Sequence, residues 1–242
     1  MLINATTAIS TSAVLLVPYS KWHVPQYHEW MKDEEIQEAT ASEPLTLEEE
    51  YAMQQSWRSD ADKLTFITCH PVEPSQQQQP LTDYHDSPDR MVGDINLFLR
   101  IDDGEEGTSP PQIIGEVELM VAEKRNQRRG FGRASLLVFL RYIADNERAI
   151  LDEFVARGSD PAAREKLPNP LQLSCLSVKI GQVNARSLAL FESVSFEKVS
   201  TEPNFFGEFE LRRTDLSRGS VDELLGRAGI TDYVELKYQR SG

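Results

Sequence analysis

The sequence predicts a single mixed α/β (α+β) domain. Between residues 13 and 213, segments with the period of a strand alternate with segments of helical period, and turn-forming residues separate them. Apolar residues make up 40% of the 242 residues and charged residues 26%, which is typical of a globular chain with a sizeable core. Since we find no internal repeat, we expect one domain over residues 1–213 and a C-terminal tail over 214–242.

The first half of the domain contains two helical and several extended patterns. Residues 13–17 form a strand pattern that ends at Pro18, and residues 23–37 form a helical pattern. A second helix is expected over residues 46–58, because Thr46 and Glu49 have the spacing of a capping box. Segments rich in β-branched and large apolar residues predict the next strands, at 64–69, 91–100 and 113–122.

The second half continues the alternation. We expect a largely apolar helix from Gly132 to about Asn146, then a strand over 173–180, a helix over 185–194, and strands at 196–199 and 206–213. Polar segments rich in Pro, Gly or carboxylates predict insertions at 71–90, 102–112 and 147–170. The tail carries a short helical pattern at 221–227 and a strand-like segment at 233–238.

Charge and composition exclude several classes of partner. The chain has 39 acidic and 25 basic residues, a formal net charge of −14, whereas nucleic-acid binding depends on Lys and Arg. We therefore expect no nucleic-acid partner. The longest apolar stretch near the N-terminus is too short for a membrane span, and two cysteines cannot build a disulfide framework, so we expect a cytoplasmic protein. His23 and His28 lie five residues apart, not the spacing of a metal pair on one helix face, so no metal is expected.

One segment combines a strand, a basic loop, two glycines and a helix. It is residues 115–133, GEVELMVAEKRNQRRGFGR. Free N–H groups of the first helical turn, the positive end of the helix dipole and the side chains of Arg128, Arg129 and Arg133 would together bind an anion. In so acidic a chain, this basic cluster indicates a phosphorylated cofactor.

This segment departs from two known phosphate-loop patterns and matches a third. A Walker loop needs Lys and a hydroxyl after the last glycine, but Arg133 and Ala134 follow Gly132. A dinucleotide fingerprint would place its third glycine at Ser135 and needs a following strand much closer in sequence. The third pattern, Gln/Arg-x-x-Gly-x-Gly/Ala, is met without a gap by residues 127–132.

With this motif the sequence resembles the GNAT acetyltransferases. Their second motif is resembled by the strand at 173–180 followed by Asn184, Ser187, Leu190, Phe191 and Phe196. The resemblance implies a mixed, mostly antiparallel sheet of about seven strands that splays between its fourth and fifth strands and is flanked by about four helices. It also implies acetyl-CoA as cofactor. The cofactor-binding residues it implies are Met120, Val121, Ala122, Gln127, Arg128, Arg129, Gly130, Phe131, Gly132, Arg133, Asn184, Ser187 and Phe191.

A closer resemblance is to the N-acetyltransferase 9-like proteins, a eukaryotic branch of that family. It covers most of residues 16–191, through LVPYSKWHVPQYHEWMKDEE, TASEPLTLEEEYAMQQSW, MVGDINLFLR, GEVELMVAE and KIGQVNARSLALF. It implies an N-acetyltransferase that acts on a protein N-terminus, with α- and β-tubulin as substrates. The amine would attack the thioester directly in a ternary complex.

The expected general base is one of two carboxylates. Glu116 and Glu118 alternate with apolar residues and therefore share one face of their strand; the sequence does not choose between them. An α-amine with a pKa of about 7.7 to 8.0 is roughly 10 to 20% neutral at pH 7, against about one part in 2,500 for lysine, so a mild base suffices.

Two positions depart from the family pattern. Ser177 stands where many N-terminal acetyltransferases have His or Glu, and Phe191 stands where many members have the Tyr that protonates the thiolate. A weakly active or inactive protein-binding module, associated with microtubules, is therefore the alternative to the enzyme. A small-molecule amine acetyltransferase is the third. The sequence sets no oligomeric state.

Overall fold

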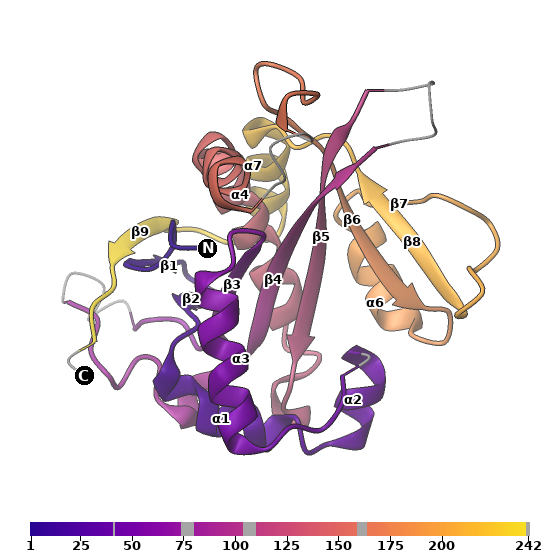
Figure 1. Cartoon of the computed structure of the whole chain (residues 1–242). Helices are drawn as coiled ribbons and strands as arrows, with labels where there is room; N and C mark the ends of the chain where they lie inside the picture. Colours follow the sequence, from indigo (N-terminus) through magenta and orange to yellow (C-terminus); the bar gives the residue numbers. More distant parts are fainter. Residues whose placement is uncertain (41, 74–79, 104–109, 159–163, 241–242) are drawn as a thin grey trace.

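The computed structural model describes residues 1–40, 42–73, 80–103, 110–158 and 164–240. These residues form a mixed α/β fold around one nine-stranded sheet, in the order β7-β8-β6-β5-β4-β3-β2-β1-β9 (Figure 1). Every neighbouring pair is antiparallel except β5 and β6, which are parallel. The expected fold class is confirmed, with two more strands than expected.

The strands follow the extended patterns of the sequence closely in the middle of the sheet. Their bounds are β1 (Thr7–Ser10), β2 (Leu15–Pro18), β3 (Lys63–Cys69), β4 (Met91–Asp102), β5 (Gln112–Val121), β6 (Leu173–Gly181), β7 (Glu197–Lys198), β8 (Glu208–Arg213) and β9 (Val234–Lys237). Strand β1 was not expected, and β9 is the strand-like segment of the expected tail, here part of the sheet. They bond to each other at the edge of the sheet, where Ile9 lies opposite Glu235.

Helices cover both faces of the sheet (Figure 1). One face packs against α1 (Val24–Trp30) and α3 (Leu47–Ser59), and α2 (Glu34–Thr40) follows α1. The other face packs against α4 (Phe131–Arg157), α6 (Ala185–Glu192) and α7 (Arg218–Arg227). The strand residues alternate accordingly: Leu16 joins the α4 cluster, whereas Leu15 and Val17 join the α1 cluster. No helix in the described ranges has both the length and the apolar content that a bilayer crossing requires.

The start of α3 is the capping box that the sequence predicts. Thr46 Oγ1 accepts the main-chain N–H of Glu49 at 3.3 Å, and Glu49 Oε2 accepts the N–H of Thr46 at 2.8 Å. Two N–H groups that the helix cannot satisfy internally are thereby paired.

The prediction of a single helix over residues 23–37 is wrong, because the first helix ends at Trp30. Asp33 Oδ1 accepts the N–H of Glu35 at 2.9 Å and so starts α2 as a separate helix. Short polar side chains compete in this way with the main-chain bonds of a continuous helix.

The helix α4 is longer than expected. Residues 147–157, which the sequence assigns to an insertion, continue it instead. Ile150, Leu151 and Phe154 extend its buried face into the core, each 3% exposed or less, and this burial stabilises the added turns. The expected insertions at 71–90, 102–112 and 147–170 lie partly outside the described residues.

The segment after residue 213, expected as a tail, contributes to both layers. Its helix α7 buries Val221, Leu224 and Leu225 in the α4 cluster, and its strand β9 pairs with β1. The described residues before and after position 213 therefore pack together without a gap between them.

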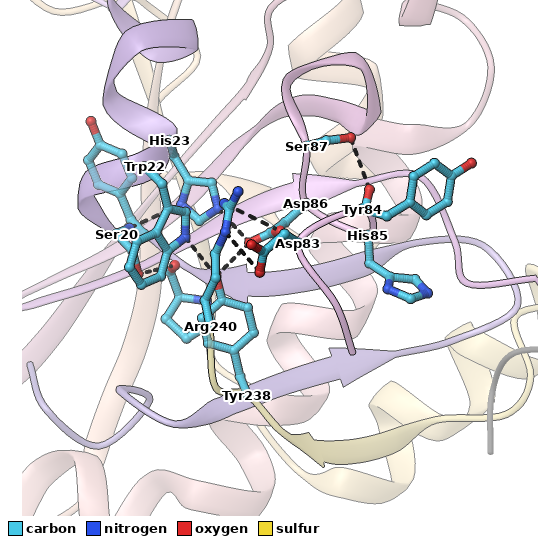
Figure 2. A network of polar contacts seen from close by, with 12 residues as sticks. Ser20, Trp22, His23, Asp83, Tyr84, His85, Asp86, Ser87, Tyr238 and Arg240 are labelled. Atoms are coloured by element: carbon cyan, nitrogen blue, oxygen red, sulfur yellow. Dashed lines mark hydrogen bonds and ion pairs between the residues drawn. The ribbon is translucent and has the colours of Figure 1, made fainter. Parts of the chain in front are cut away.

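A polar network joins this C-terminal segment to the loop before β4 and to the turn that precedes α1 (Figure 2). Asp86 is 2% exposed, and its Oδ2 accepts hydrogen bonds from His23 Nε2 at 3.0 Å and Tyr238 Oη at 2.5 Å. The guanidinium of Arg240 lies 3.5 Å from Oδ1 and stacks over the ring of Trp22. Burial alone would raise the pKa of Asp86, but these donors hold it below its usual value.

Candidate active site at the splay of the sheet

The parallel strands β5 and β6 pair over only part of their length. Their ladder begins at Ile113 opposite Leu173 and ends at Glu116 opposite Ser177. Beyond this point β5 continues to Val121 and β6 to Gly181, but the described residues of the two strands no longer pair with each other. Figure 1 shows the two strands diverging toward these ends. The expected splay between these strands is confirmed.

Main-chain groups of β5 line the open side of the splay. The N–H of Ala122 donates to Val92 on β4 at 3.0 Å. Peptide groups alternate in direction along a strand, so those of Leu119 and Val121 point away from β4, toward the side where β6 diverges. The carbonyl of Val121 accepts a bond of 3.3 Å from Gln127 Nε2. Of the three expected pantetheine-binding positions, Val121 therefore presents its peptide to the splay, whereas Met120 and Ala122 face β4.

The loop into α4 has the conformation of an anion-binding nest. Arg128 has a φ of 60° and Gly130, the N-cap of α4, a φ of 88°. The main-chain N–H groups of Arg128, Arg129 and Gly130 have no hydrogen-bond partner among the described residues, and those of the first α4 turn have none within the helix. Successive free N–H groups in such a turn converge on an anion.

Three arginines at this loop have no acidic partner among the described residues, although the guanidinium of Arg129 lies over the ring of Phe131, 5.8 Å from its centroid. Arg128, Arg129 and Arg133 are exposed and form no ion pair with the described residues. The neighbouring Lys124 and Arg125 are engaged already: Lys124 lies 2.9 Å from Glu35, and Arg125 pairs with Glu123. Lys124 and Arg125 are therefore held in ion pairs, whereas the three arginines that follow them are not, among the described residues.

The space around the two glycines suits a diphosphate. A Cβ at Gly130 would meet no atom within 4 Å, so the approach to its N–H is open. A Cβ at Gly132 would lie 3.5 to 3.7 Å from Leu190, Leu119 and Val121, which places this glycine between α6 and the open edge of β5. The residues present fit the diphosphate and pantetheine of coenzyme A.

The expected second-motif residues serve chiefly the start and packing of α6. Asn184 is the N-cap, and its Oδ1 accepts the N–H of Ser187 at 3.1 Å. Phe191 is 3% exposed and packs edge-on against Phe196 with ring centroids 5.0 Å apart. Phe191 is thus a core residue with no polar atom at the splay.

The structure distinguishes the two candidate carboxylates. Glu116 Oε2 lies 3.0 Å from Nζ of Lys179 on β6. This ion pair connects the two strands where their pairing ends. Glu118 has no hydrogen-bond or ion-pair partner in the described part of the chain. It keeps contact with solvent, but nearby protein reduces its hydration and raises its pKa to about 7; the charges of Asp94 and Glu116 act in the same direction.

Sequence reasoning missed two polar residues beside Glu118. Asp94 and Asn96 lie on β4, on the face that packs against α1, and they are 2% and 3% exposed. Asp94 Oδ2 accepts bonds from Tyr27 Oη at 3.2 Å and Asn96 Nδ2 at 3.0 Å. Burial raises the pKa of Asp94 to about 6, and these bonds limit the rise. The signal was two polar residues two positions apart within an apolar strand.

A cavity of about 270 Å³ adjoins the end of β5. It lies between the α1–α2 segment and the loop toward α4, and is lined by Glu29, Trp30, Asp33, Ile36, Ala122, Glu123, Lys124 and Arg125. Space for a second ligand therefore exists beside the nest.

Comparisons with known proteins agree with this geometry. The chain matches the acetyltransferase (GNAT) domain model over residues 13–197. It is 38% identical to the N-acetyltransferase 9-like protein of Schizosaccharomyces pombe, an alignment that covers 88% of this chain and 100% of that protein. It is 40% identical to the human protein named alpha/beta-tubulin-N-acetyltransferase 9, with 100% and 98% covered.

Among solved structures, the spermidine N-acetyltransferase of Vibrio cholerae in complex with CoA and spermine shares the fold. The TM-score is 0.54 at 14% identity, over 83% of this chain and 94% of that one. The family match and the relatives, together with the splayed strands and the nest, show that the chain belongs to the GNAT acetyltransferases and uses acetyl-CoA.

Proposed function

We propose that the chain transfers the acetyl group of acetyl-CoA to the N-terminal α-amine of a protein, with α- or β-tubulin as the first candidate. The substrate is suggested by the name that the human and Drosophila melanogaster relatives share, alpha/beta-tubulin-N-acetyltransferase 9, at 40% and 39% identity. The observation that carries the mechanism is the unpaired carboxylate of Glu118 at the open edge of β5.

The residues of the nest hold the cofactor in this proposal. The N–H groups of residues 128–132 and the side chains of Arg128, Arg129 and Arg133 bind the diphosphate, since these N–H groups have no partner among the described residues and the three exposed guanidinium groups lie on the same loop and first helical turn. The peptide groups of Leu119 and Val121 bind the pantetheine arm at the open edge of β5. When bound, acetyl-CoA supplies the acetyl group as a thioester.

Glu118 is the general base. A carboxylate with a pKa of about 7 is about half ionised at neutral pH, yet basic enough to accept a proton from an ammonium of similar pKa. Glu116 is less suited because it is held by Lys179. Ser177 supplies no base, and its Oγ donates to the carbonyl of Gly115 at 3.5 Å. Phe191 has no ionisable group, so CoA leaves as a thiolate, which a thiol pKa of about 8.5 permits.

The substrate chain has room beside the cofactor. The 270 Å³ cavity at Ala122 is lined by three carboxylates and by two basic side chains, Lys124 and Arg125, which are paired with Glu35 and Glu123. Of the carboxylates, Asp33 is the one that we expect to face a positively charged N-terminal segment, because Glu29 pairs with Lys32 and Glu123 with Arg125. We place this reaction in the cytoplasm, where the free thiols of Cys69 and Cys175 would stay reduced.

The test is mass spectrometry of peptides incubated with the protein and acetyl-CoA. One peptide carries the tubulin N-terminus with a free α-amine and no lysine; a second has the same sequence, a blocked N-terminus and one added lysine. We expect a mass gain of one acetyl group on the first peptide only. Acetylation of the lysine peptide alone would contradict the proposal. Cofactor binding without transfer to any peptide would favour the protein-binding module, and transfer only to small amines the third alternative.

A further inference from the structure

Asn96 has a buried acceptor without a partner. Its side chain is 3% exposed, and its Oδ1 makes no hydrogen bond within the described chain. The same amide donates through Nδ2 to Asp94 at 3.0 Å. Buried amide oxygens are nearly always paired in folded proteins, so this oxygen indicates a group that the chain alone does not provide.

The orientation of this amide is fixed by its neighbours. Ionised Asp94 can only accept hydrogen bonds, so it must face the NH₂ end of Asn96. Tyr27 Oη donates to the same Asp94 oxygen at 3.2 Å and holds the carboxylate in place. Turning the amide over would set two acceptors against each other. The hydrogen bonds that Tyr27 and Asn96 donate to Asp94 thus keep the side-chain oxygen of Asn96 turned away from Asp94.

The position of Asn96 in the sheet places it beside the proposed base. In the antiparallel ladder Asn96 lies directly opposite Glu118 on β5, and their side chains share one face. Opposite residues have Cβ atoms about 5 Å apart, within reach of a single bound amine. On its other side Asn96 lies opposite Thr65 of β3, whose Oγ1 is also buried and unpartnered, so the two side chains do not satisfy each other.

We propose that Asn96 Oδ1 accepts a hydrogen bond from the substrate amine, next to Glu118, and that Asp94 and Tyr27 are positioning residues that keep it turned that way. The inference rests on the proposed function and names the groups that hold its substrate. The ammonium gives one proton to the carboxylate of Glu118, which becomes a neutral carboxyl. Asn96 holds a second N–H, so the neutral amine keeps a defined orientation.

The test exchanges donor and acceptor roles between two nearly isosteric side chains. In Asp94→Asn, residue 94 can donate its NH₂ to the oxygen of Asn96 and turn that amide over. We expect the KM for the peptide to rise about 10- to 100-fold, the range of a hydrogen bond to a charged group, with the KM for acetyl-CoA unchanged. In Asp94→Asn with Asn96→Asp, an acceptor faces the amine again, and the KM should recover to within several-fold of the original.

Thr65→Val is the matched control, since it removes the other unpartnered oxygen beside Asn96. It should leave both KM values unchanged. Active Asp94→Asn and Asn96→Ala variants that both keep the peptide KM of the unaltered protein would overturn the proposal. So would a double variant that melts normally and binds acetyl-CoA without recovering.

A second measurement applies if the protein transfers nothing to any peptide. Calorimetric titration of the peptide in the presence of CoA still reports the amine site. Binding that is lost in Asn96→Ala and kept in Thr65→Val supports the Asn96 assignment while the proposed reaction fails. No binding by the unaltered protein overturns both.

Discussion

Asn96 and Glu118 lie directly opposite each other on β4 and β5, with their side chains on the face of the sheet that packs against α1. Glu118 lies two residues beyond Glu116, the last residue of β5 that pairs with β6. A partly desolvated carboxylate and a buried amide oxygen therefore meet where the sheet opens. This arrangement has consequences for the pH dependence of the reaction.

Replacing Glu118 by Gln should remove the base and its titration. The pKa of Glu118 is raised to about 7, so the carboxylate is lost as the pH falls through 7. In the unaltered protein we expect kcat to fall about tenfold per pH unit below this value, because only the ionised form accepts a proton. In Glu118→Gln we expect kcat to be lower by about 10²- to 10⁴-fold, and its pH limb to move from about 7 to the pKa of the amine, about 7.7 to 8.0.

The matched control is Glu116→Gln, the same change on the same face. It removes the ion pair with Lys179 but should keep the fall in kcat below pH 7. A pH limb that stays at about 7 in Glu118→Gln and moves up in Glu116→Gln would reverse the assignment of the two residues.

Replacing Asp86 by Ala should destabilise the fold strongly. His23, Tyr238 and Arg240 would each lose a buried partner, and removing one member of a buried charged network costs about 3 to 5 kcal/mol. Tyr238→Phe removes two bonds, the one that Oη donates to Asp86 and the one that it accepts from Trp22 Nε1, and should cost about 2 to 4 kcal/mol. Urea denaturation at pH 7 measures both. A loss below 0.5 kcal/mol (a threshold at about the size of an ordinary surface substitution) in Asp86→Ala would show that the network is incidental.

Acid should weaken the same network. The pKa of Asp86 is held below its usual value, so its contribution is present above the unfolded pKa and is lost as the pH falls through the folded one. Burial lowers the pKa of His23 below 6.5, so the unfolded chain binds a proton first and stability begins to fall below about pH 6.5. Glu118 and Asp94 have raised pKa values and stabilise the fold as the pH falls, so each contribution is measured as the difference in free energy of unfolding between the unaltered protein and a variant that keeps both carboxyls. The difference for His23→Gln should shrink as the pH falls below 6.5, and that for Asp86→Ala as it falls below about 4. A difference that grows over its range would contradict the assignment.

Phe154→Ala tests whether the second half of α4 belongs to the core. Phe154 is 3% exposed, and truncation of a buried Phe costs about 3 to 5 kcal/mol through lost transfer energy and a cavity. Phe206 is 81% exposed, so Phe206→Ala is the matched control and should change stability by about 0.5 kcal/mol or less. If residues 147–157 were a peripheral insertion, the two variants would unfold at similar urea concentrations.

The features that could be predicted from sequence are local. The capping box at Thr46 and the nest at residues 127–132 depend on neighbours within a few positions, and the structure has both geometries. The alternation of apolar residues likewise identified the central strands. Each of these patterns is decided by main-chain geometry over one turn or one strand.

The remaining features depend on contacts between distant segments. Residues 147–157 have a polar sequence on one side, and only the burial of Ile150, Leu151 and Phe154 against the core shows that they extend α4. The pairing of β1 with β9 joins segments more than 200 residues apart. Short strands of this kind are stabilised by their partner and by little in their own sequence.

The choice of base is also a tertiary property. Glu116 and Glu118 are equivalent in the sequence pattern, and they differ because Lys179 of β6 reaches only the first of them. Asp94 and Asn96 share a face that the pattern does show, but their role depends on Tyr27 from α1, which no local spacing reveals.

Acetyl-CoA binding by calorimetry tests the central claim most directly, namely that the diphosphate lies on the main-chain N–H groups at the start of α4. The informative variant combines Arg129→Glu with Gly132→Asp, and its control makes the same two changes on α7, Arg227→Glu with Gly226→Asp, where both residues are exposed or open. We predict that the first variant weakens binding by about 100-fold or more, since two anions replace groups that bind an anion, and that the control binds like the unaltered protein. Equal affinity in all three proteins would contradict the account.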